Sequence, residues 1–410
     1  MEIRPTTDED RDVFVDTMHT AFGRFPETPD EHGGGVWWAA LEMDRNVLAV
    51  TEDGRPVGTA GTYSFELTLP GGALVPAAGV TAVGVVPSHR RRGVLSAMMR
   101  HQLTELRDRG EILSVLLASE AVIYRRFGYG PATYSGRLTV PRHRASFAAP
   151  RAGGGAGPDL TDEGSVEVLR SDRCRALLEE IYDRYRRVQP GALSRPHHWW
   201  EVGAGQPPIA PAPRHIAVHR DAHGTPDGYV SYAISEPDVL KADEIIAVDD
   251  AAYTALARHV LEHDLVGEIV IKHVPAGHPL RWQLADFRAA ETGPDGDWLW
   301  VRILDVPRAL TARGWSTDGD LVLEVTDPFL GGAPERHLLS VHDGKADCVR
   351  TDREPDLSLD VSDLGSIYLG GTTPSTLVRA GHIKAHHAEA SELADTLFRT
   401  DRAPHCLHWF

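Results

Sequence analysis

Cysteine is scarce in this sequence of 410 residues, which contains Cys174, Cys348 and Cys406 and no others. The three lie far apart and at no metal-ligand spacing, so neither a disulfide scaffold nor a zinc site is expected. Long apolar runs are also missing, and no stretch approaches the length that spans a bilayer. Residues 1–16 are dotted with charged side chains, unlike a signal peptide, so we expect a cytoplasmic protein.

Basic residues are outnumbered, since 42 lysines and arginines face 59 aspartates and glutamates and the net charge is −17. A field of this sign repels nucleic acid and favours cationic small molecules or basic partners, although acidity also serves solubility. Histidines stand in adjacent pairs at His197-His198 and His386-His387. Adjacent side chains point to different faces, and no cysteine or carboxylate stands at ligand spacing, so we expect no metal.

Residues 1–150 alternate strand and helix patterns. Period-two apolar runs predict strands over 3–5, 46–51, 56–65, 80–86 and 112–118, and helical spacing predicts helices over 8–22, 93–109 and 122–127. The glycine- and proline-rich stretch "RAGGGAGPDL" (151–160) then predicts a linker.

Residues 151–297 contain an echo of the first segment after an expected helix over 173–187. The stretches 46–65 and 214–235 both read as an apolar strand, an Asp/Gly turn and a strand that carries a tyrosine. A strand and a helix follow each of them, but Asp249 and Asp250 replace the basic residues of the first copy. We interpret the pattern as two copies of one fold, of which the second lacks the basic loop between its strand and its helix. Chance similarity of the two stretches is the alternative.

The pattern changes again over residues 298–410. Strands are expected over 321–326 and 357–360, and helices over 304–313, 362–368, 372–380 and 388–398. This mixture predicts an α+β domain at the end of the chain.

The stretch "VTAVGVVPSHRRRGVLSAMMRHQL" (80–103) carries the main functional signal. Its β-branched first half predicts a strand, its second half has helical spacing, and basic residues with a glycine lie between them. The first amides of a helix lack internal partners and stand at the positive end of the macrodipole. Glycine permits close backbone approach, and arginine forks match phosphate oxygens. The turn therefore predicts a pyrophosphate site, the alternative being a solvated basic helix start.

The letters of this turn fit neither a P-loop nor a Rossmann fingerprint. Arg90-Arg91-Arg92-Gly93-Val94-Leu95 instead resembles the acyl-CoA loop of the GNAT acetyltransferase superfamily, with Leu95 where that loop has glycine or alanine. Ser96 follows and could donate to a phosphate.

A second stretch, "LLASEAVIYRRFGYGPATYS" (116–135), resembles the GNAT strand, short helix and Phe-Gly-Tyr turn. The resemblance implies that Tyr124 is the general acid, with Tyr129 and Tyr134 as competing donors. The chemistry suits a phenol, because a group of pKa about 10 can protonate a departing thiolate whose thiol has a pKa of about 8.5.

The two stretches and the three-part layout are similar to one family in particular, the enhanced intracellular survival (Eis-like) N-acetyltransferases. The resemblance implies an α/β (α+β) fold with an active GNAT domain (1–150), a degenerate GNAT domain (151–297) and a sterol-carrier-protein-like domain (298–410). It implies acetyl-CoA as co-substrate, no metal, and a homo-hexamer. The implied coenzyme-binding residues are Val83, Gly84, Val85, Arg90, Arg91, Arg92, Gly93, Val94, Leu95, Ser96, Ser119 and Glu120.

In this family the terminal carboxylate, carried by an aromatic last residue, lies in the active site, and the sequence printed here ends in Phe410. With a reference pKa of about 3.3–3.7 that group is a weak base, better suited to binding an ammonium and relaying its proton. Leu407, Trp409 and Phe410 predict that the tail docks, whereas a frayed tail is the general expectation. His405 and His408 are rival bases.

A substrate site is expected before the first hairpin. Glu27, with neighbouring acids, could hold a cation, and Trp37 and Trp38 could wall the pocket; the alternative is that these are surface acids and a half-buried pair of tryptophans. We therefore expect direct acetyl transfer, in a ternary complex, to primary amines of aminoglycoside-like cations or to lysine side chains. The alternatives are a lipid- or sterol-binding protein on a GNAT scaffold and an acyltransferase for longer acyl-CoA chains.

Overall fold

The computed structural model describes residues 1–23, 40–148, 164–170, 174–201, 214–235, 238–294 and 296–410. It divides into two compact units, of which unit 1 joins residues 1–133 to 297–410 and unit 2 consists of residues 134–296. In the described part of the chain, no helix is long and apolar enough to cross a membrane.

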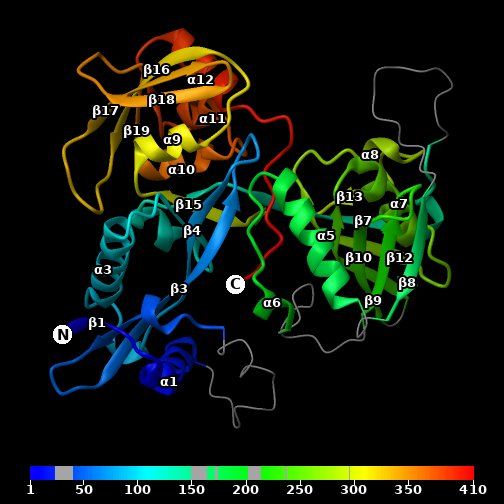
Figure 1. The fold of residues 1–410 in the computed structure, drawn as a ribbon, viewed down its shortest axis with the longest axis horizontal. Coiled ribbons are helices and arrows are strands. Elements are labelled where there is room, and N and C mark those ends of the chain that lie inside the picture. The colour runs from blue at the N-terminus through cyan, green and yellow to red at the C-terminus, as the bar shows by residue number, and fades with distance from the viewer. Residues whose placement is uncertain (24–39, 149–163, 171–173, 202–213, 236–237, 295) are drawn as a thin grey trace. The chain divides into compact units, whose positions relative to one another are not determined.

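A seven-stranded sheet forms the first half of unit 1 (Figure 1). Its strands, in spatial order, are β1 (Glu2–Pro5), β2 (Val47–Val50), β3 (Pro56–Thr68), β4 (Leu74–Val85), β5 (Leu113–Leu117), β15 (Leu299–Ile303) and β6 (Gly130–Pro131). Its helices are α1 (Arg11–Phe22), α3 (Val94–Asp108) and α4 (Ala121–Tyr124), with 3-10 turns at η1 (Asp8–Asp10), η2 (Met43–Arg45), η3 (Pro87–His89) and η4 (Arg125–Phe127). The strands and helices predicted for this segment are present, but β3 and β4 run further toward their shared turn than the apolar alternation indicated.

Helix α3 packs on this sheet through an apolar stripe. Val94 and Met98 join the cluster of β2 and β3, whereas Met99, Leu103 and Leu106 join the cluster of β4 and β5. Each such side chain contributes about 2 kcal/mol when fully buried. This apolar packing fixes α3, the helix that begins at the basic turn, against the sheet.

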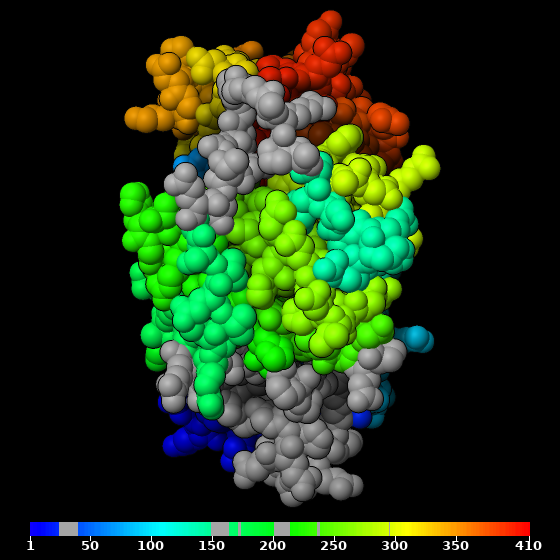
Figure 2. All heavy atoms as spheres, turned by 90° about the vertical axis from the view of Figure 1, so that its right-hand side faces the viewer, coloured from blue at the N-terminus to red at the C-terminus, as the bar shows by residue number. Residues whose placement is uncertain are grey.

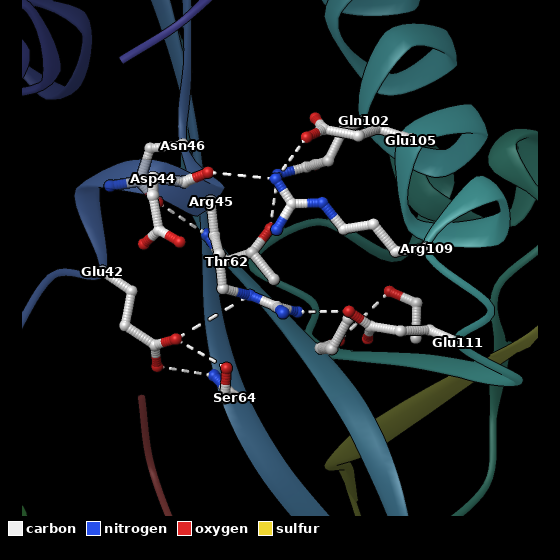
Figure 3. A network of polar contacts seen from close by, with 12 residues as sticks. Glu42, Asp44, Arg45, Asn46, Thr62, Ser64, Gln102, Glu105, Arg109 and Glu111 are labelled. Atoms are coloured by element: carbon white, nitrogen blue, oxygen red, sulfur yellow. Dashed lines mark hydrogen bonds and ion pairs between the residues drawn. The ribbon is translucent and has the colours of Figure 1, made fainter. Parts of the chain in front are cut away.

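A polar network fastens the same helix to β3 and η2 (Figure 3). Gln102 Nε2 donates to Thr62 Oγ1 at 2.8 Å, and Asn46 Oδ1 accepts from the Thr62 amide at 2.9 Å. Nearby, Arg45 Nη2 lies 2.6 Å from a carboxylate oxygen of Glu111, just before β5. Because these groups are largely buried, their pairing fixes one register between α3 and the sheet.

The second half of unit 1 is a five-stranded sheet with four helices. Its strands, in spatial order, are β18 (Lys345–Arg350), β17 (Glu335–His342), β16 (Gly319–Thr326), β19 (Leu357–Asp360) and β20 (Lys384–Ala385). The helices are α9 (Val306–Ala312), α10 (Val361–Tyr368), α11 (Pro374–Arg379) and α12 (Ala388–Phe398).

Arg313 occupies the interior of this second half. Its side chain is buried and donates to three backbone carbonyls, those of Tyr368 (2.9 Å), Leu397 (3.3 Å) and Phe398 (2.7 Å). Burial lowers the pKa of Arg313 to about 10, so it remains charged at neutral pH. A charged side chain therefore links the end of α10 to the end of α12 inside this half.

We expect Arg313→Ala to lower the free energy of unfolding by about 3 kcal/mol, because three buried carbonyls lose their donor. Arg399→Ala is the control, since the Arg399 side chain is 74% exposed. Thermal and denaturant unfolding measure the difference. Equal unfolding curves for the two variants would contradict the structural role assigned to Arg313.

Unit 2 is built on a second sheet, and Figure 2 shows its surface in teal to yellow-green. Its path is β13 (Glu291–Thr292), β7 (Tyr134–Pro141), β12 (Glu268–Pro275), β11 (Val239–Ala247), β10 (Pro226–Ser235), β9 (His215–Arg220) and β8 (Ser165–Leu169), with β14 (Gly296–Asp297) paired to β7. Its helices are α5 (Arg175–Val188), α6 (His197–Glu201), α7 (Asp250–Leu261) and α8 (Leu280–Gln283). The expected echo is visible as β9–β10 followed by β11 and α7.

Several strands were not predicted from the sequence. β8 precedes the helix that was expected to open the second segment, and β17 and β18 lie between the strands predicted for the third. Segments also cross the predicted boundaries, because β7 pairs with β12 in unit 2 while β15 pairs with β5 in unit 1. The three-domain division at 150 and 297 stays a prediction, and the compact units follow different bounds.

Candidate active site

The central feature of unit 1 is a fork between β4 and β5. The two strands pair in parallel at Ala78↔Ser114 and Gly79↔Val115. Beyond Gly79, β4 continues along β3 through an irregularity at Ala82, whose φ is +49°. Residues 81–85 are half-buried, unlike the fully buried stretch before them. The edge of β4 that turns away from β3 therefore offers its backbone groups to a ligand in the fork.

Val83, Gly84 and Val85 form the last part of this edge. The side chains of Val83 and Val85 pack against the cluster under α3, so apolar packing and a backbone role coexist. Because successive groups along one strand edge alternate in direction, an amide here can point into the fork. Such an amide is suited to stabilise a developing oxyanion.

The basic turn leads from β4 into the first turn of α3. Gly93 stands at the N-cap with a φ of +83°, in the left-handed region that favours glycine. The first helical bond runs from the Ala97 amide to the Gly93 carbonyl at 3.0 Å. The amides of Val94, Leu95 and Ser96 precede that bond, so they are the groups available to an anion.

The three arginines of the turn differ in their surroundings. Arg90 donates to the backbone carbonyls of Val85 (3.1 Å) and Ala21 (2.6 Å). Its guanidinium therefore links the turn to α1 and is not free to bind phosphate. Arg91 and Arg92 are exposed beside Gly93. Of the predicted basic ligands, these two are therefore the better placed for a diphosphate.

Tyr124 ends the short helix α4 and is 8% exposed. It belongs to the apolar cluster that also contains Val80, Val83 and Leu95, so the structure brings it to the same cluster as the fork and the start of α3. Burial raises the pKa of Tyr124, and a hydrogen bond with Ser119 opposes this rise. A phenol with a raised pKa stays protonated and can act as a proton donor at neutral and alkaline pH.

The competing tyrosines have other surroundings. Tyr129 is fully buried, and its hydroxyl lies 2.7 Å from Ser114 Oγ. That pairing explains Tyr129 as a structural residue that packs edge-on against Tyr124, with ring centroids 6.3 Å apart. Tyr134 begins β7, which belongs to unit 2.

The last residues of unit 1 reach the fork. The Phe410 ring packs against Phe65, with centroids 4.9 Å apart, and is 8% exposed. A Cβ at Gly79 would lie 2.4 Å from Phe65 and 3.1 Å from Phe410, so only glycine admits both rings at the end of the β4–β5 pairing. His408 packs edge-on against Phe65, with ring centroids 5.2 Å apart.

The docking of the tail differs from the expected pattern. Trp409 was expected to dock with Leu407 and Phe410, yet it is 47% exposed, while His405 and His408 are buried. From residue 406 onward burial alternates, since residues 406, 408 and 410 are buried, Leu407 is half-buried and the larger ring at 409 faces outward.

Two of the residues predicted to bind the coenzyme are exposed, and the residues predicted to bind the substrate lie outside the part of the chain that the structure describes. Ser119 and Glu120 precede α4 and are exposed. Glu27, Trp37 and Trp38, predicted for the substrate, lie outside the described residues. Phe65 and Gly79 were missed from sequence, although a glycine inside a β-branched strand is a known signal of close approach.

Unit 2 repeats the fork, but a side chain caps the helix that follows it. β11 pairs in parallel with β12 over residues 239–242, and α7 follows β11. The N-terminus of α7 is capped by its own chain, since Asp249 Oδ1 accepts from the Ala252 amide at 2.9 Å. A carboxylate thus stands where a phosphate would need to bind, which agrees with a second copy that lacks loop chemistry.

Comparison with known proteins gives matches along the whole chain. Models of an acetyltransferase (GNAT) domain match residues 2–132 and 191–303, and a sterol carrier protein domain model matches residues 306–407. These matches and the mixed α/β architecture confirm the predicted fold class of two GNAT domains and a sterol-carrier-like domain.

Individual relatives are similar over nearly their full length. N-acetyltransferase Eis of Mycobacterium tuberculosis is 36% identical over 375 residues, which are 89% of each chain. An uncharacterized N-acetyltransferase of Streptomyces griseus is 35% identical over 421 residues, 99% of each chain. The crystal structure of Eis1 from Mycobacterium abscessus has a TM-score of 0.87 at 34% identity and covers 100% of both chains. A GCN5-related N-acetyltransferase from Anabaena variabilis, at 21% identity and a TM-score of 0.82, shares the fold.

Proposed function

Since the chain belongs to the Eis-like N-acetyltransferases of the GNAT superfamily, we propose that it transfers acetyl groups from acetyl-CoA to primary amines of cationic small molecules. Aminoglycoside-like polyamines are the favoured class, and lysine side chains are the second. The observation that carries the proposal is the fork between β4 and β5, which opens beside the start of α3 and beside Tyr124.

The coenzyme side of the site is assigned to the first amides of α3, with Arg91 and Arg92. Acetyl-CoA, when bound, supplies the activated acetyl thioester. The Val83 backbone is proposed to donate to the thioester carbonyl oxygen, whose negative charge grows as the amine attacks. The Tyr124 hydroxyl then gives its proton to the departing sulfur. Attack is direct in a ternary complex, with no covalent enzyme intermediate.

The amine side is assigned to the tail. An ammonium has no lone pair, so it must lose a proton before attack. With Phe410 as last residue, its carboxylate attracts the ammonium and passes the proton on, directly or through water. The net charge of −17 supports a cationic acceptor through long-range attraction.

The test is release of free thiol from acetyl-CoA in the presence of a panel of amines. We expect an aminoglycoside such as tobramycin and a polyamine to stimulate release, and a neutral amide of similar size to leave it at background. Calorimetric titration with CoA tests the first half separately. Well-folded protein that gives no saturable heat would refute the coenzyme site, and saturable binding without any amine-dependent release would refute the reaction.

Removing the charge of the turn should weaken coenzyme binding. We expect Arg91→Ala combined with Arg92→Ala to raise the Kd of acetyl-CoA about tenfold, because charge-assisted bonds to phosphate are lost, and kcat to stay close to wild type. Calorimetry at two salt concentrations measures the Kd of both proteins. The ratio between the Kd of the variant and that of the wild type should become smaller at high salt, because salt screens the charges. Arg55→Ala, in the exposed β2–β3 turn, is the control. An unchanged Kd would exclude these arginines from the site.

Three further points of the proposal have their own measurements. A lipid-binding role is the alternative, and titration with a fluorescent sterol tests it. Acetyl-, propionyl- and hexanoyl-CoA in competition test the acyl length, for which acetyl is expected. Assembly as a homo-hexamer is tested by sedimentation.

A further inference from the structure

Tyr124 is followed directly by a residue that contacts the sterol-carrier-like half of unit 1. The Arg125 guanidinium forms an ion pair and hydrogen bond with Asp363 Oδ1, at the start of α10. Its Nη2 also lies 2.9 Å from His382 Nδ1, between α11 and β20. The residue next to the proposed acid is therefore held by two side chains from distant parts of the sequence.

Asp363 is a fixed partner. Its side chain is 2% exposed, and its second oxygen, Oδ2, accepts from the Asp360 amide at 3.3 Å in the capping box of α10. A carboxylate buried to this degree is costly unless it is paired. Arg125 supplies the positive charge, so a displacement of Arg125 would leave this buried carboxylate without its ion pair.

Helix α10 is itself locked onto the acetyltransferase sheet. All eight of its residues are buried. A Cβ at Gly130 in β6 would lie 1.9 Å from the Ser362 carbonyl oxygen, and a Cβ at Gly365 would lie 2.3 Å from that of Val301 in β15. The backbone of α10 therefore contacts the backbone of both β6 and β15. Because this packing is tight, a side chain that is bonded to α10 is held in a fixed position relative to the sheet.

Helix α4 is too short to fix its own position and depends on contacts with other elements. It has four residues, one turn, and an isolated turn of helix is unstable by itself. At this helix the Ile123 amide donates to the Glu120 carbonyl at 3.0 Å and the Tyr129 amide to the Tyr124 carbonyl at 3.3 Å, and the bond from the Gly128 amide to the Arg125 carbonyl at 2.9 Å closes the following turn, η4. The position of the phenol then depends on the apolar cluster around the ring, on its hydrogen bond with Ser119 and on what holds the next residue.

We propose that Asp363 is a positioning residue for catalysis, which holds Tyr124 in reach of the reacting sulfur through Arg125. The inference rests on the proposed function and on the role of Tyr124 in it. It assigns the sterol-carrier-like half a part in the chemistry that does not depend on binding a lipid. Asp363 touches no substrate in this scheme, so its loss should alter kcat and leave coenzyme affinity intact.

The test begins with Asp363→Asn, which keeps the size of the side chain and an oxygen for the Asp360 amide. We expect kcat to fall about tenfold, since displacement of a reacting group by about 1 Å costs up to about 100-fold, and the KM for acetyl-CoA to stay within twofold. Arg125→Lys should retain more activity than Arg125→Ala, because lysine keeps the charge without the fork. The control is Arg308→Ala, which breaks another link within unit 1, from Arg308 Nη1 to the Gly110 carbonyl at 2.9 Å, away from α4.

A double-mutant cycle separates positioning from general stability. With Tyr124→Phe already present, adding Asp363→Asn should change the residual single-turnover rate less than twofold, because Asp363 acts through the missing phenol. A tenfold loss in both backgrounds, a loss equal to that of Arg308→Ala, or an unchanged kcat in Asp363→Asn would each overturn the proposal. Failure of the proposed function has a different signature: the wild-type protein would then release no thiol in response to any amine, whereas failure of the positioning role leaves the wild-type rate intact.

Discussion

Tyr124→Phe is expected to lower kcat by about 100-fold, with the Kd of acetyl-CoA unchanged. The substitution removes the one oxygen that is proposed to protonate the leaving sulfur and keeps the ring that packs with Val80 and Leu95. Steady-state release of thiol gives kcat, and calorimetry gives the Kd. A variant with wild-type kcat would remove Tyr124 from the mechanism.

Tyr129→Phe is the matched control. Its hydroxyl is 2.7 Å from Ser114 Oγ inside the core, so we expect a loss of about 1 kcal/mol in stability and a kcat within a few-fold of wild type. If instead Tyr129→Phe abolishes turnover and Tyr124→Phe does not, the acid has been assigned to the wrong phenol.

The pH profile gives an independent check on the same residue. A general acid is lost as pH rises through its pKa, and burial raises the pKa of Tyr124 above the ordinary value for a phenol, about 10. The alkaline fall in kcat should therefore lie above that value, and it should be absent from the residual activity of Tyr124→Phe. A fall well below it that persists in the variant would belong to another group.

Removing Phe410 is the second change with a large expected effect, a loss of about 100-fold in kcat/KM for the amine with coenzyme binding retained. The deletion takes away both the proposed carboxylate and a ring that packs on Phe65 and Gly79. Thiol release at varied amine concentration measures the loss. Activity equal to wild type would remove the tail from the site.

Two further variants separate charge from packing. Phe410→Leu keeps the terminal carboxylate and most of the apolar volume, so a modest loss is expected. One glycine added after Phe410 keeps the ring and moves the carboxylate, so a loss similar to the deletion is expected. The reverse order would assign the effect to the ring. Trp409→Ala, at a position that is 47% exposed, is the control and should remain near wild type.

Local patterns identified the parts of the site that are continuous in sequence. The strand, basic turn and helix over residues 80–103 were predictable because β-branched residues, Gly93 and an apolar helical stripe each leave a clear mark. Tyr124 and Phe410 came from resemblance to a family, and the contacts of Phe410 with Phe65 and Gly79 were not foreseen. No local pattern reports that two segments so distant in the chain lie together.

The misses have physical causes as well. Arg90 was predicted as a phosphate ligand, but its guanidinium is bonded to two backbone carbonyls. One of them, that of Ala21, is brought to it only by the tertiary structure. β18 was missed because this edge strand alternates weakly and is mostly exposed. The partners of β7 and β15 could not be deduced, because pairing between distant segments depends on shape and burial over the whole unit.

The position of β15 constrains how the protein is made. It lies between β5 and β6 in space, yet it is encoded after all of unit 2. During synthesis both neighbours leave the ribosome long before the strand that joins them, and the β5 edge stays open to incorrect pairing in that interval. The nascent acetyltransferase sheet thus remains unfinished until Leu299–Ile303 emerges, and a fragment that ends at residue 150 would lack the strand that closes it.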